Sequence, residues 1–298
     1  MTTTKGDGGS KPGAAHIIAF QGLPGAYSDL ACRQVHPDMT TFPCQTFEDA
    51  FAVVEEGGAR LAMIPIENSV AGRVADIHQL MPHSELYIVA EHFQRVNHHL
   101  LAPKGATLDG LTHAHSHVHA LSQCRRFLFE RGITPVIHAD TAGAAKDVAT
   151  RGDPTEAAIA SELAAETYGL VSLAANIEDA THNTTRFVVL AKEIEDPGAD
   201  APSVMTAFHF GVRNVSAALY KALGCFATNG VNMTKLESYM VGGNFSSTEF
   251  YAEIEGHPED GPAKLALDEL DFYTEKLRII GIFPAHPFRK QTGEANGG

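Results

Sequence analysis

Apolar and polar positions alternate along the first two thirds of the chain in a way that predicts short strands followed by helices. Each apolar, β-branched run is bounded by a turn or capping residue, and an amphipathic pattern follows. This alternation is typical of an α/β fold. The predicted strands are residues 16–20, 39–42, 60–66, 86–102, 111–115, 135–139, 157–160 and 184–190. The predicted helices are 27–35, 71–80 with Asn68 or Ser69 as N-cap, 118–131, 141–150, 161–168, and one that begins at a Thr46 capping box.

The longest extended run, residues 86–102, exceeds an average strand and therefore predicts a crossing between two lobes. A second set of strands and helices follows it, and the strand at 184–190 comes last. We therefore expect a two-lobed α/β domain over residues 16–192, whose second lobe covers about 101–180. The last strand is expected to run back across a cleft between the lobes, beside helix N-termini where sites in such sheets lie.

A different unit follows this domain. Residues 193–203 are rich in acidic residues, proline and glycine, and we interpret them as a linker. Residues 204–284 have the pattern β-α-β-β-α-β, which predicts a split, ferredoxin-like module. Such modules commonly pair with one another, so a dimer is expected. Residues 1–15 and 285–298 are expected to be a disordered extension and a disordered tail.

The charge balance restricts the partners. Lysine and arginine number 22 and aspartate and glutamate 36, which gives a net charge of −14 without any basic cluster. Nucleic acids and anionic membranes need concentrated positive charge, so neither is expected as a partner. A small anion is compatible, because helix N-termini and hydroxyls bind carboxylates. Scattered cysteines and the lack of an apolar export or spanning segment predict a cytoplasmic protein with reduced thiols.

Residues 176–190 are a polar loop that leads into a strand opening with two hydroxyls. Side chains alternate along a strand, so Thr185 and Phe187 share one face while Thr184 and Arg186 share the other. An edge strand that starts polar because it leaves a loop is the simpler interpretation of this stretch by itself. The alternative is a face that carries a hydroxyl beside an aromatic ring and lines a site.

Three predicted helix starts could bind an anion: residues 22–28, 67–72 and 140–142. Each offers unpaired backbone N–H groups together with hydroxyl or amide side chains. Ordinary capping explains each of them alone. Placed around one cleft with Thr185, the three would form a pocket for a polycarboxylate.

Four histidines, at positions 113, 115, 117 and 119, suggest a metal site at first sight. The run crosses a predicted strand-to-helix junction and has no cysteine or carboxylate partners, so no metal is expected. The chain also has no Ser-His-Asp spacing, nucleotide loop or zinc motif. Chemistry without a cofactor is therefore expected.

Several segments in a fixed order carry a family resemblance. They are Gly22-Leu-Pro-Gly-Ala-Tyr-Ser-Asp29, Pro65-Ile-Glu-Asn-Ser69, His98-His-Leu-Leu101, Ala120-Leu-Ser-Gln-Cys124, Asp140-Thr-Ala142, Asn176-Ile-Glu-Asp179 and Asn183-Thr-Thr-Arg-Phe187. With them, the chain resembles prephenate dehydratases that carry a C-terminal ACT regulatory domain, over nearly its whole length. The resemblance implies a two-lobed fold similar to periplasmic binding proteins. It also implies conversion of prephenate to phenylpyruvate, carbon dioxide and water, in phenylalanine biosynthesis.

The resemblance assigns roles by position. Thr185 matches the family's catalytic threonine, which would donate a hydrogen bond or proton to the leaving hydroxyl. Phe187 would line the ring site, and the strand pattern leaves open whether Arg186 braces the lobe or reaches a carboxylate through a bulge. The implied substrate contacts are Tyr27, Ser28, Glu67, Asn68, Ser69, His98, Thr141, Asn183, Arg186 and Phe187.

The C-terminal module is expected to bind L-phenylalanine as an effector, in a homodimer or homotetramer. The family's glycine-alanine-leucine pattern appears here as Ala217-Ala218-Leu219, and its glutamate-serine-arginine-proline as Glu237-Ser238-Tyr239-Met240. Two alternatives stay open: an arogenate dehydratase, and a non-catalytic two-lobed sensor. The implied effector contacts are Asn214, Ala217, Ala218, Leu219, Glu237 and Ser238.

Overall fold

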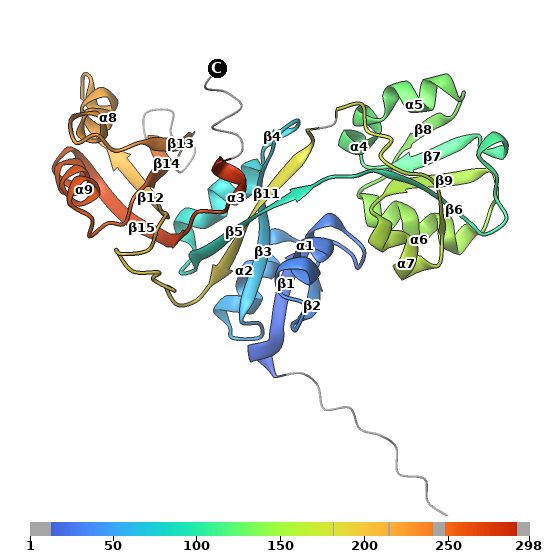
Figure 1. The fold of residues 1–298 in the computed structure, drawn as a ribbon, viewed down its shortest axis with the longest axis horizontal. Helices are drawn as coiled ribbons and strands as arrows, with labels where there is room; N and C mark the ends of the chain where they lie inside the picture. Colours follow the sequence, from blue (N-terminus) through green and yellow to red (C-terminus); the bar gives the residue numbers. More distant parts are fainter. Residues whose placement is uncertain (1–12, 181, 214, 241–247, 291–298) are drawn as a thin grey trace, which may run out of the picture.

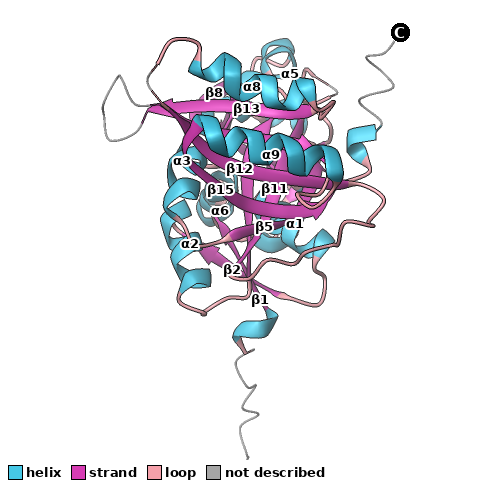
Figure 2. Ribbon diagram, turned by 90° about the vertical axis from the view of Figure 1, so that its left-hand side faces the viewer, coloured by secondary structure: helices cyan, strands magenta, loops and turns pink. Residues whose placement is uncertain are grey.

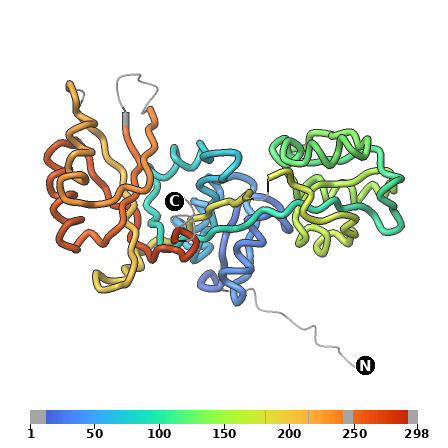
Figure 3. Tube along the Cα trace, turned by 45° about the horizontal axis from the view of Figure 1, so that its top comes forward, coloured from blue at the N-terminus to red at the C-terminus, as the bar shows by residue number. Residues whose placement is uncertain are grey.

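The computed structural model describes residues 13–180, 182–213, 215–240 and 248–290. These residues form three bodies in a row, with a first lobe in the middle, a second lobe on one side and a C-terminal module on the other (Figures 1 and 3). Two long strands, β5 and β11, leave the first lobe toward the second (Figure 1).

The first lobe is built on parallel and antiparallel strands. β1 pairs in parallel with β2 and β3, while β11 lies antiparallel between β3 and β5. The predicted capping box is confirmed, because Thr46 Oγ1 accepts from Asp49 N and the Asp49 carboxylate accepts from Thr46 N. The helix predicted at 71–80 begins later than expected, since residues 72–73 pair with β3 instead. The elements are β1 (Ile17–Gln21), α1 (Tyr27–Val35), β2 (Thr40–Cys44), α2 (Phe47–Glu55), β3 (Leu61–Asn68), β4 (Gly72–Arg73), α3 (Ala75–Leu80), β5 (Tyr87–Arg95) and β11 (Thr184–Ala191).

The second lobe is a five-stranded sheet of order β10-β6-β9-β7-β8. Asp140 caps α6 by accepting a hydrogen bond from Gly143 N at 2.6 Å, as the sequence indicated. The helix predicted at 118–131 is split in two at Cys124, and strand β10 was not predicted. The elements are β6 (His99–Ala102), β7 (His113–Ser116), α4 (Val118–Gln123), α5 (Arg125–Glu130), β8 (Thr134–Ile137), α6 (Thr141–Arg151), β9 (Glu156–Ala160), α7 (Glu162–Tyr168) and β10 (Val171–Ala174).

The C-terminal module is an antiparallel sheet of order β13-β14-β12-β15. Its helices α8 and α9 lie together on one face of that sheet (Figure 2). None of the described helices, here or in the lobes, is long and apolar enough to cross a membrane. The elements are β12 (Val204–Val212), α8 (Ala218–Thr228), β13 (Met233–Met240), β14 (Thr248–Glu255), α9 (Gly261–Tyr273) and β15 (Thr274–Pro284).

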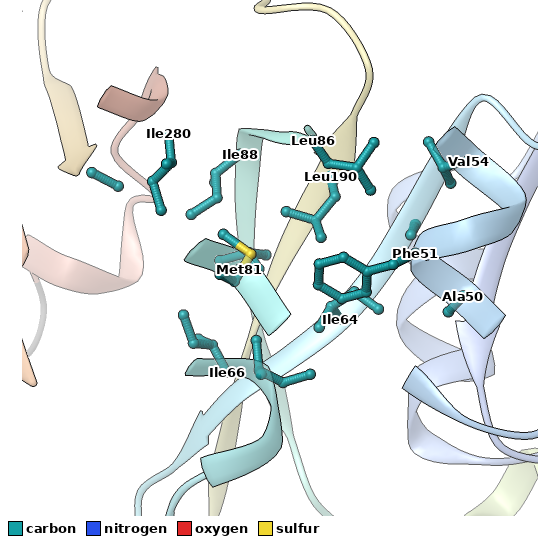
Figure 4. Packing of buried hydrophobic residues seen from close by; sticks show 14 of the residues in the cluster. Ala50, Phe51, Val54, Ile64, Ile66, Met81, Leu86, Ile88, Leu190 and Ile280 are labelled. Carbon is teal, nitrogen blue, oxygen red and sulfur yellow. The ribbon is translucent and has the colours of Figure 1, made fainter. Parts of the chain in front are cut away.

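The C-terminal module and the first lobe share one sheet and one core. β15 pairs in parallel with β5 where Gly281 meets Ile88, which joins the two into a ten-stranded sheet. A Cβ atom at Gly281 would lie 2.6 Å from Ile88 Cβ, so only glycine permits this approach. Ile280 packs into the same apolar cluster as Ile88 and Ile64 (Figure 4). The predicted linker therefore does not separate two independently packed units.

Residues 285–290 differ from the predicted disordered tail. The backbone N–H of His286 donates to Glu91 Oε1 at 2.9 Å, and Arg289 Nε donates to the same oxygen at 2.6 Å. The ring of Phe288 stacks on Phe93 with centroids 4.8 Å apart. These contacts hold the segment against β5, because a buried carboxylate and an aromatic ring there both need partners.

Candidate active site

Strand β11 carries the candidate catalytic threonine to the point where the first lobe meets the second. Thr185 lies opposite Asn68 of β3 on one side and opposite Gln94 of β5 on the other. The register on β3 is irregular just after this point, because Arg186 faces Glu67 while Phe187 faces Pro65. Thr185 therefore has a paired strand on each side, because β11 (yellow in Figure 1) lies between β3 (blue) and β5 (teal).

Asn68 holds the Thr185 hydroxyl. Its Oδ1 accepts from the backbone N–H groups of Val70 at 2.9 Å and Ala71 at 2.8 Å. Its Nδ2 donates to Thr185 Oγ1 at 2.9 Å and to Asn183 Oδ1 at 2.8 Å. Asn68 therefore closes a side-chain turn where the sequence suggested a helix cap, and that turn orients its amide toward Thr185.

A continuous set of hydrogen bonds, called here the hydrogen-bond chain, extends from Thr185 and Asn68 to the second lobe. Asn183 Nδ2 donates to Gln123 Oε1 at 2.7 Å, and Gln123 Oε1 lies 2.9 Å from His98 Nε2. His98 Nδ1 in turn lies 2.8 Å from the Tyr27 hydroxyl. Five residues selected from the sequence are joined in this way. Gln123 was not selected, although it belongs to a segment of the family resemblance.

The hydrogen-bond chain is partly buried and mostly uncharged. His98 is 2% exposed and Asn183 is 1% exposed. Burial lowers the pKa of His98, which keeps its imidazole neutral at physiological pH. Burial also raises the pKa of the Tyr27 hydroxyl well above its usual value. The nearby buried carboxylate of Glu178 accepts from the His98 backbone N–H at 2.9 Å, so the polar groups here are satisfied.

Arg186 points to the opposite side of β11 from Thr185 and is 3% exposed. Its guanidinium donates to Glu253 through Nη1 at 2.8 Å and Nη2 at 2.9 Å, to Glu91 through Nε at 2.9 Å, and to Glu67 through Nη1 at 3.2 Å. Burial alone would lower the pKa of Arg186, but the carboxylates raise it well above its usual value. Strand alternation and these partners favour the bracing role for Arg186, one of the two roles that the strand pattern left open.

Two further predicted substrate contacts, Glu67 and Phe187, are engaged in other interactions in this structure. Glu67 is paired with Arg186 and with Lys235 of the C-terminal module, so it belongs to the bracing side of β11. Phe187 is 1% exposed and packs in a core cluster with Phe20. Phe187 lies on the same face of β11 as Thr185, as alternation requires. It is two residues further along the strand, inside the apolar core of the first lobe.

The three remaining predicted contacts are hydroxyls at loops and helix starts. Ser69 Oγ donates to His182 O at 2.8 Å and accepts from Thr184 N at 3.0 Å, which fastens the Asn68 turn to β11. Ser28 is buried in the first turn of α1, and Thr141 begins α6. Among the described residues, no hydrogen bond joins Ser28 or Thr141 to the hydrogen-bond chain.

The glycine loop after β1 packs against the second lobe. Ser161 Oγ donates to Gly25 O at 2.5 Å, and Gly25 N donates to the buried Asp29 carboxylate at 2.9 Å. At Gly25, where φ is +86°, a Cβ would lie 2.8 Å from Ala164 Cα. A cavity of about 210 Å³ lies beside this contact, lined by residues of both lobes that include Tyr27 and Ser161.

Five of the six predicted effector residues lie at described positions of the C-terminal module, and two of these five contact the first lobe. Ala217 precedes α8 with a left-handed backbone, φ 62°. On β13, Glu237 Oε2 and Ser238 O accept from Arg73 Nη1 of β4, at 3.2 and 3.3 Å. The other predicted contacts are Ala218 and Leu219 in the first turn of α8, and Asn214, which lies outside the described residues.

The histidine run does not form one cluster. His115 Nε2 lies 3.5 Å from Glu156 Oε1, while the rings of His117 and His119 lie 5.1 Å apart at the start of α4. Over the described ranges, no group of three or more histidine, cysteine, aspartate or glutamate side chains is arranged to hold a metal ion.

Comparisons with known proteins point in one direction. Residues 18–195 match the family model described as prephenate dehydratase. A bifunctional N-acyl-homoserine lactone acylase/prephenate dehydratase of Komagataeibacter europaeus is 54% identical over 275 residues, which are 92% of this chain and 98% of that protein. Arogenate dehydratase/prephenate dehydratase 1 of Arabidopsis thaliana is 38% identical over 90% of this chain and 71% of its own length. The structure of a prephenate dehydratase from Arthrobacter aurescens in complex with L-Phe is similar with a TM-score of 0.83 and 28% identity, covering 94% of this chain and 97% of that one.

Proposed function

Because this chain belongs to the prephenate dehydratase family, we propose that it converts prephenate to phenylpyruvate, carbon dioxide and water. One observation supports the placement of this chemistry at Thr185: its hydroxyl oxygen accepts a hydrogen bond from Asn68 Nδ2 at 2.9 Å. A hydroxyl that accepts this bond keeps its own proton free for another acceptor. An oxygen leaving the substrate is such an acceptor.

The reaction requires the protein to orient the substrate and to supply one hydrogen-bond donor to the leaving oxygen. The bond from ring carbon to carboxylate breaks, its electron pair moves through the ring, and the bond to the ring hydroxyl breaks, so that hydroxide departs. Aromatisation supplies the driving force. A threonine hydroxyl is too weak an acid to give up its proton fully, so Thr185 acts as a hydrogen-bond donor to the developing hydroxide, which solvent then protonates.

Neutral groups from both lobes bind the two carboxylates of the substrate in this proposal. Asn68 and Ser69 belong to the turn beside the candidate catalytic threonine, and Thr141 begins an eleven-residue helix whose N-terminal N–H groups favour an anion. Tyr27 positions His98, and through it Gln123, on the side of the site that faces the second lobe. Thr141→Val is expected to raise KM for prephenate more than it lowers kcat.

Feedback regulation by L-phenylalanine at the C-terminal module, in a homodimer or homotetramer, is the second part of the proposal. The Arthrobacter aurescens relative with bound L-Phe supports it. So does the contact of Arg73 with Glu237 and Ser238, because Arg73 lies on the strand next to the Asn68 turn. An effector acts only through different affinities for two states, so saturating L-phenylalanine should change the rate. Unchanged kinetics would remove this part of the proposal.

The arogenate dehydratase alternative differs from the leading proposal by one amino group on the substrate side chain. The Arabidopsis thaliana relative carries both activities in its name. The ratio of kcat/KM for prephenate to that for arogenate decides between them. A sensor without catalysis would instead bind either compound in calorimetry and give no product.

An acylase activity is a second candidate, which the Komagataeibacter europaeus relative supports by its name and its 54% identity. A groove of about 710 Å³ beside α4, α5 and β8 offers the apolar lining that an acyl chain needs, with Phe129 and Ile137 largely exposed. Hydrolysis of an N-acyl-homoserine lactone by water would release a fatty acid and homoserine lactone. Absence of free fatty acid removes this candidate, and release that survives Thr185→Ala separates its site from the dehydratase site.

The test of the leading proposal is direct. Purified protein is incubated with prephenate, and phenylpyruvate is measured by its absorbance in alkali. Thr185→Ser keeps the hydroxyl and the bond from Asn68, so it serves as the matched control for Thr185→Ala. The proposal fails if the parent protein makes no phenylpyruvate beyond the spontaneous rate.

A further inference from the structure

We infer that the backbone N–H groups of Val70 and Ala71 set the direction of every hydrogen bond in the hydrogen-bond chain. Asn68, Asn183 and Gln123 are then positioning residues that keep the Thr185 proton available to the substrate. The inference rests on the proposed dehydratase function, since it concerns how the same hydroxyl is prepared. It goes further by assigning a donor and an acceptor at each link, and by giving Gln123 a role.

The direction begins at the backbone. An amide N–H can only donate, so the Asn68 atom that faces Val70 N and Ala71 N must be its oxygen. The two ends of an asparagine amide are otherwise hard to tell apart, and here the two backbone donors fix them. The Asn68 NH₂ group therefore faces Asn183 and Thr185.

Each following link is forced by the one before it. A nitrogen that donates needs an oxygen opposite, so Asn183 presents Oδ1 to Asn68 and its own NH₂ to Gln123. Gln123 must then present Oε1, and this oxygen also lies 2.9 Å from His98 Nε2. His98 consequently carries its proton on Nε2, which leaves Nδ1 as an acceptor 2.8 Å from the Tyr27 hydroxyl. That hydroxyl also donates to Asn97 O at 2.8 Å, so its single proton is shared between the two acceptors. Donation runs from the Asn68 turn through Asn183 to Gln123, and from Tyr27 through His98 to the same Gln123 oxygen.

The consequence for catalysis lies at Thr185. Its Oγ1 accepts a hydrogen bond from Asn68 Nδ2, so its own O–H is not consumed by that contact. Across the described residues the Thr185 hydroxyl donates to no protein acceptor. If the Asn68 amide were reversed, its oxygen would take the Thr185 proton and the leaving oxygen of the substrate would lose its donor.

Isosteric exchanges of amide for carboxylate test the direction, because each adds one negative charge and removes one donor. Asn68→Asp keeps an oxygen for Val70 and Ala71 but turns the donor that faces Thr185 into an acceptor. We expect kcat to fall by about 10²–10³-fold, the usual effect of losing one transition-state donor. Part of the loss in kcat should be recovered at lower pH, because the new carboxyl gains a proton and can donate again. The pH profile of Asn68→Asp should therefore show an acid limb that the profile of the parent enzyme lacks.

Gln123→Glu is the matched exchange at a position where, among the described residues, only the side-chain oxygen is hydrogen-bonded. It adds the same charge but preserves both contacts to Oε1, so we expect less than about a tenfold fall in kcat, with a larger effect on KM. Asn183→Asp removes the donor to Gln123 and should lower kcat more than Gln123→Glu does. Equal losses in Asn68→Asp and Gln123→Glu, or no acid limb in Asn68→Asp, would overturn the inference.

A measurement that needs no turnover separates this inference from the proposed function. Nitrogen-15 NMR of the unliganded parent protein, with the His98 signal assigned by loss in His98→Gln, reports which ring nitrogen carries the proton. We expect a neutral imidazole protonated on Nε2. A His98 ring protonated on Nδ1 overturns the inferred direction even if prephenate is converted, whereas the Nε2 form without conversion leaves the direction standing and removes the proposed function.

Discussion

Exchange of Glu253 for glutamine should destabilise the protein strongly, because this carboxylate joins the C-terminal module to the catalytic strand. Glu253 is fully buried on β14 and accepts hydrogen bonds from both Nη atoms of Arg186, at 2.8 and 2.9 Å. Arg289 Nη2 donates to it at 2.8 Å, and the Tyr251 hydroxyl donates to it as well. Glutamine has the same shape but lacks the charge, and it points an NH₂ group at these donors.

Two estimates of the loss agree. Burial alone would raise the pKa of Glu253, but Arg186 and Arg289 lower it from 4.5 to about 2. A shift of that size corresponds to about 3 kcal/mol of stability at neutral pH. Removal of one partner from a buried ion pair typically costs about 3–5 kcal/mol. We therefore expect Glu253→Gln to lose about 3–5 kcal/mol of unfolding free energy.

The sign of the pH dependence follows from the same shift. The pKa of Glu253 is lower in the folded protein, so its contribution is complete above pH 4.5 and is lost as pH falls toward 2. Urea unfolding at pH 7.5 and between pH 5 and 3 measures both effects. The acid-dependent part should be smaller in Glu253→Gln. Glu255→Gln, an exposed exchange on the same strand, is the control and should change stability by less than about 0.5 kcal/mol. A loss below about 1 kcal/mol in Glu253→Gln would refute the reasoning.

Three further predictions concern the C-terminal module and its contacts with the first lobe. Gly281→Ala should destabilise by about 1–3 kcal/mol in urea unfolding, because the new Cβ lies 2.6 Å from Ile88 Cβ; an unchanged midpoint would contradict the close approach. Ala217→Gly should stabilise by about 1 kcal/mol in the same assay, since φ is 62° there, and a loss would contradict it. Arg73→Ala should raise the L-phenylalanine concentration for half-inhibition several-fold in the prephenate assay, because it breaks the contact with Glu237 and Ser238. The same inhibition as in the parent would contradict that link.

Local pattern predicted most of the strands and helices, and the family resemblance supplied the choice of Thr185, Asn68, Asn183, His98 and Tyr27. Strand alternation depends only on neighbouring residues, so it also placed Thr185 and Arg186 on opposite faces. The structure joins the five selected side chains in one set of hydrogen bonds.

Contacts between residues that lie far apart in the sequence could not be predicted from local pattern. The direction of Arg186 depends on Glu253, which is 67 positions away along the chain, and on Glu91. Arg289 joins them from a segment that was predicted to be disordered. Gln123 contacts Asn183 because the second lobe packs beside β11, and no local sequence pattern predicts that packing.

The most direct test of the account is the rate at which Thr185→Ala and Thr185→Ser produce phenylpyruvate from prephenate. The account predicts a fall in kcat of about 10²–10³-fold for Thr185→Ala, because the donor to the leaving oxygen is gone, and a fall of less than about tenfold for Thr185→Ser. Urea unfolding of both variants shows whether the fold is kept. A Thr185→Ala enzyme that is folded and as active as the parent would contradict the account.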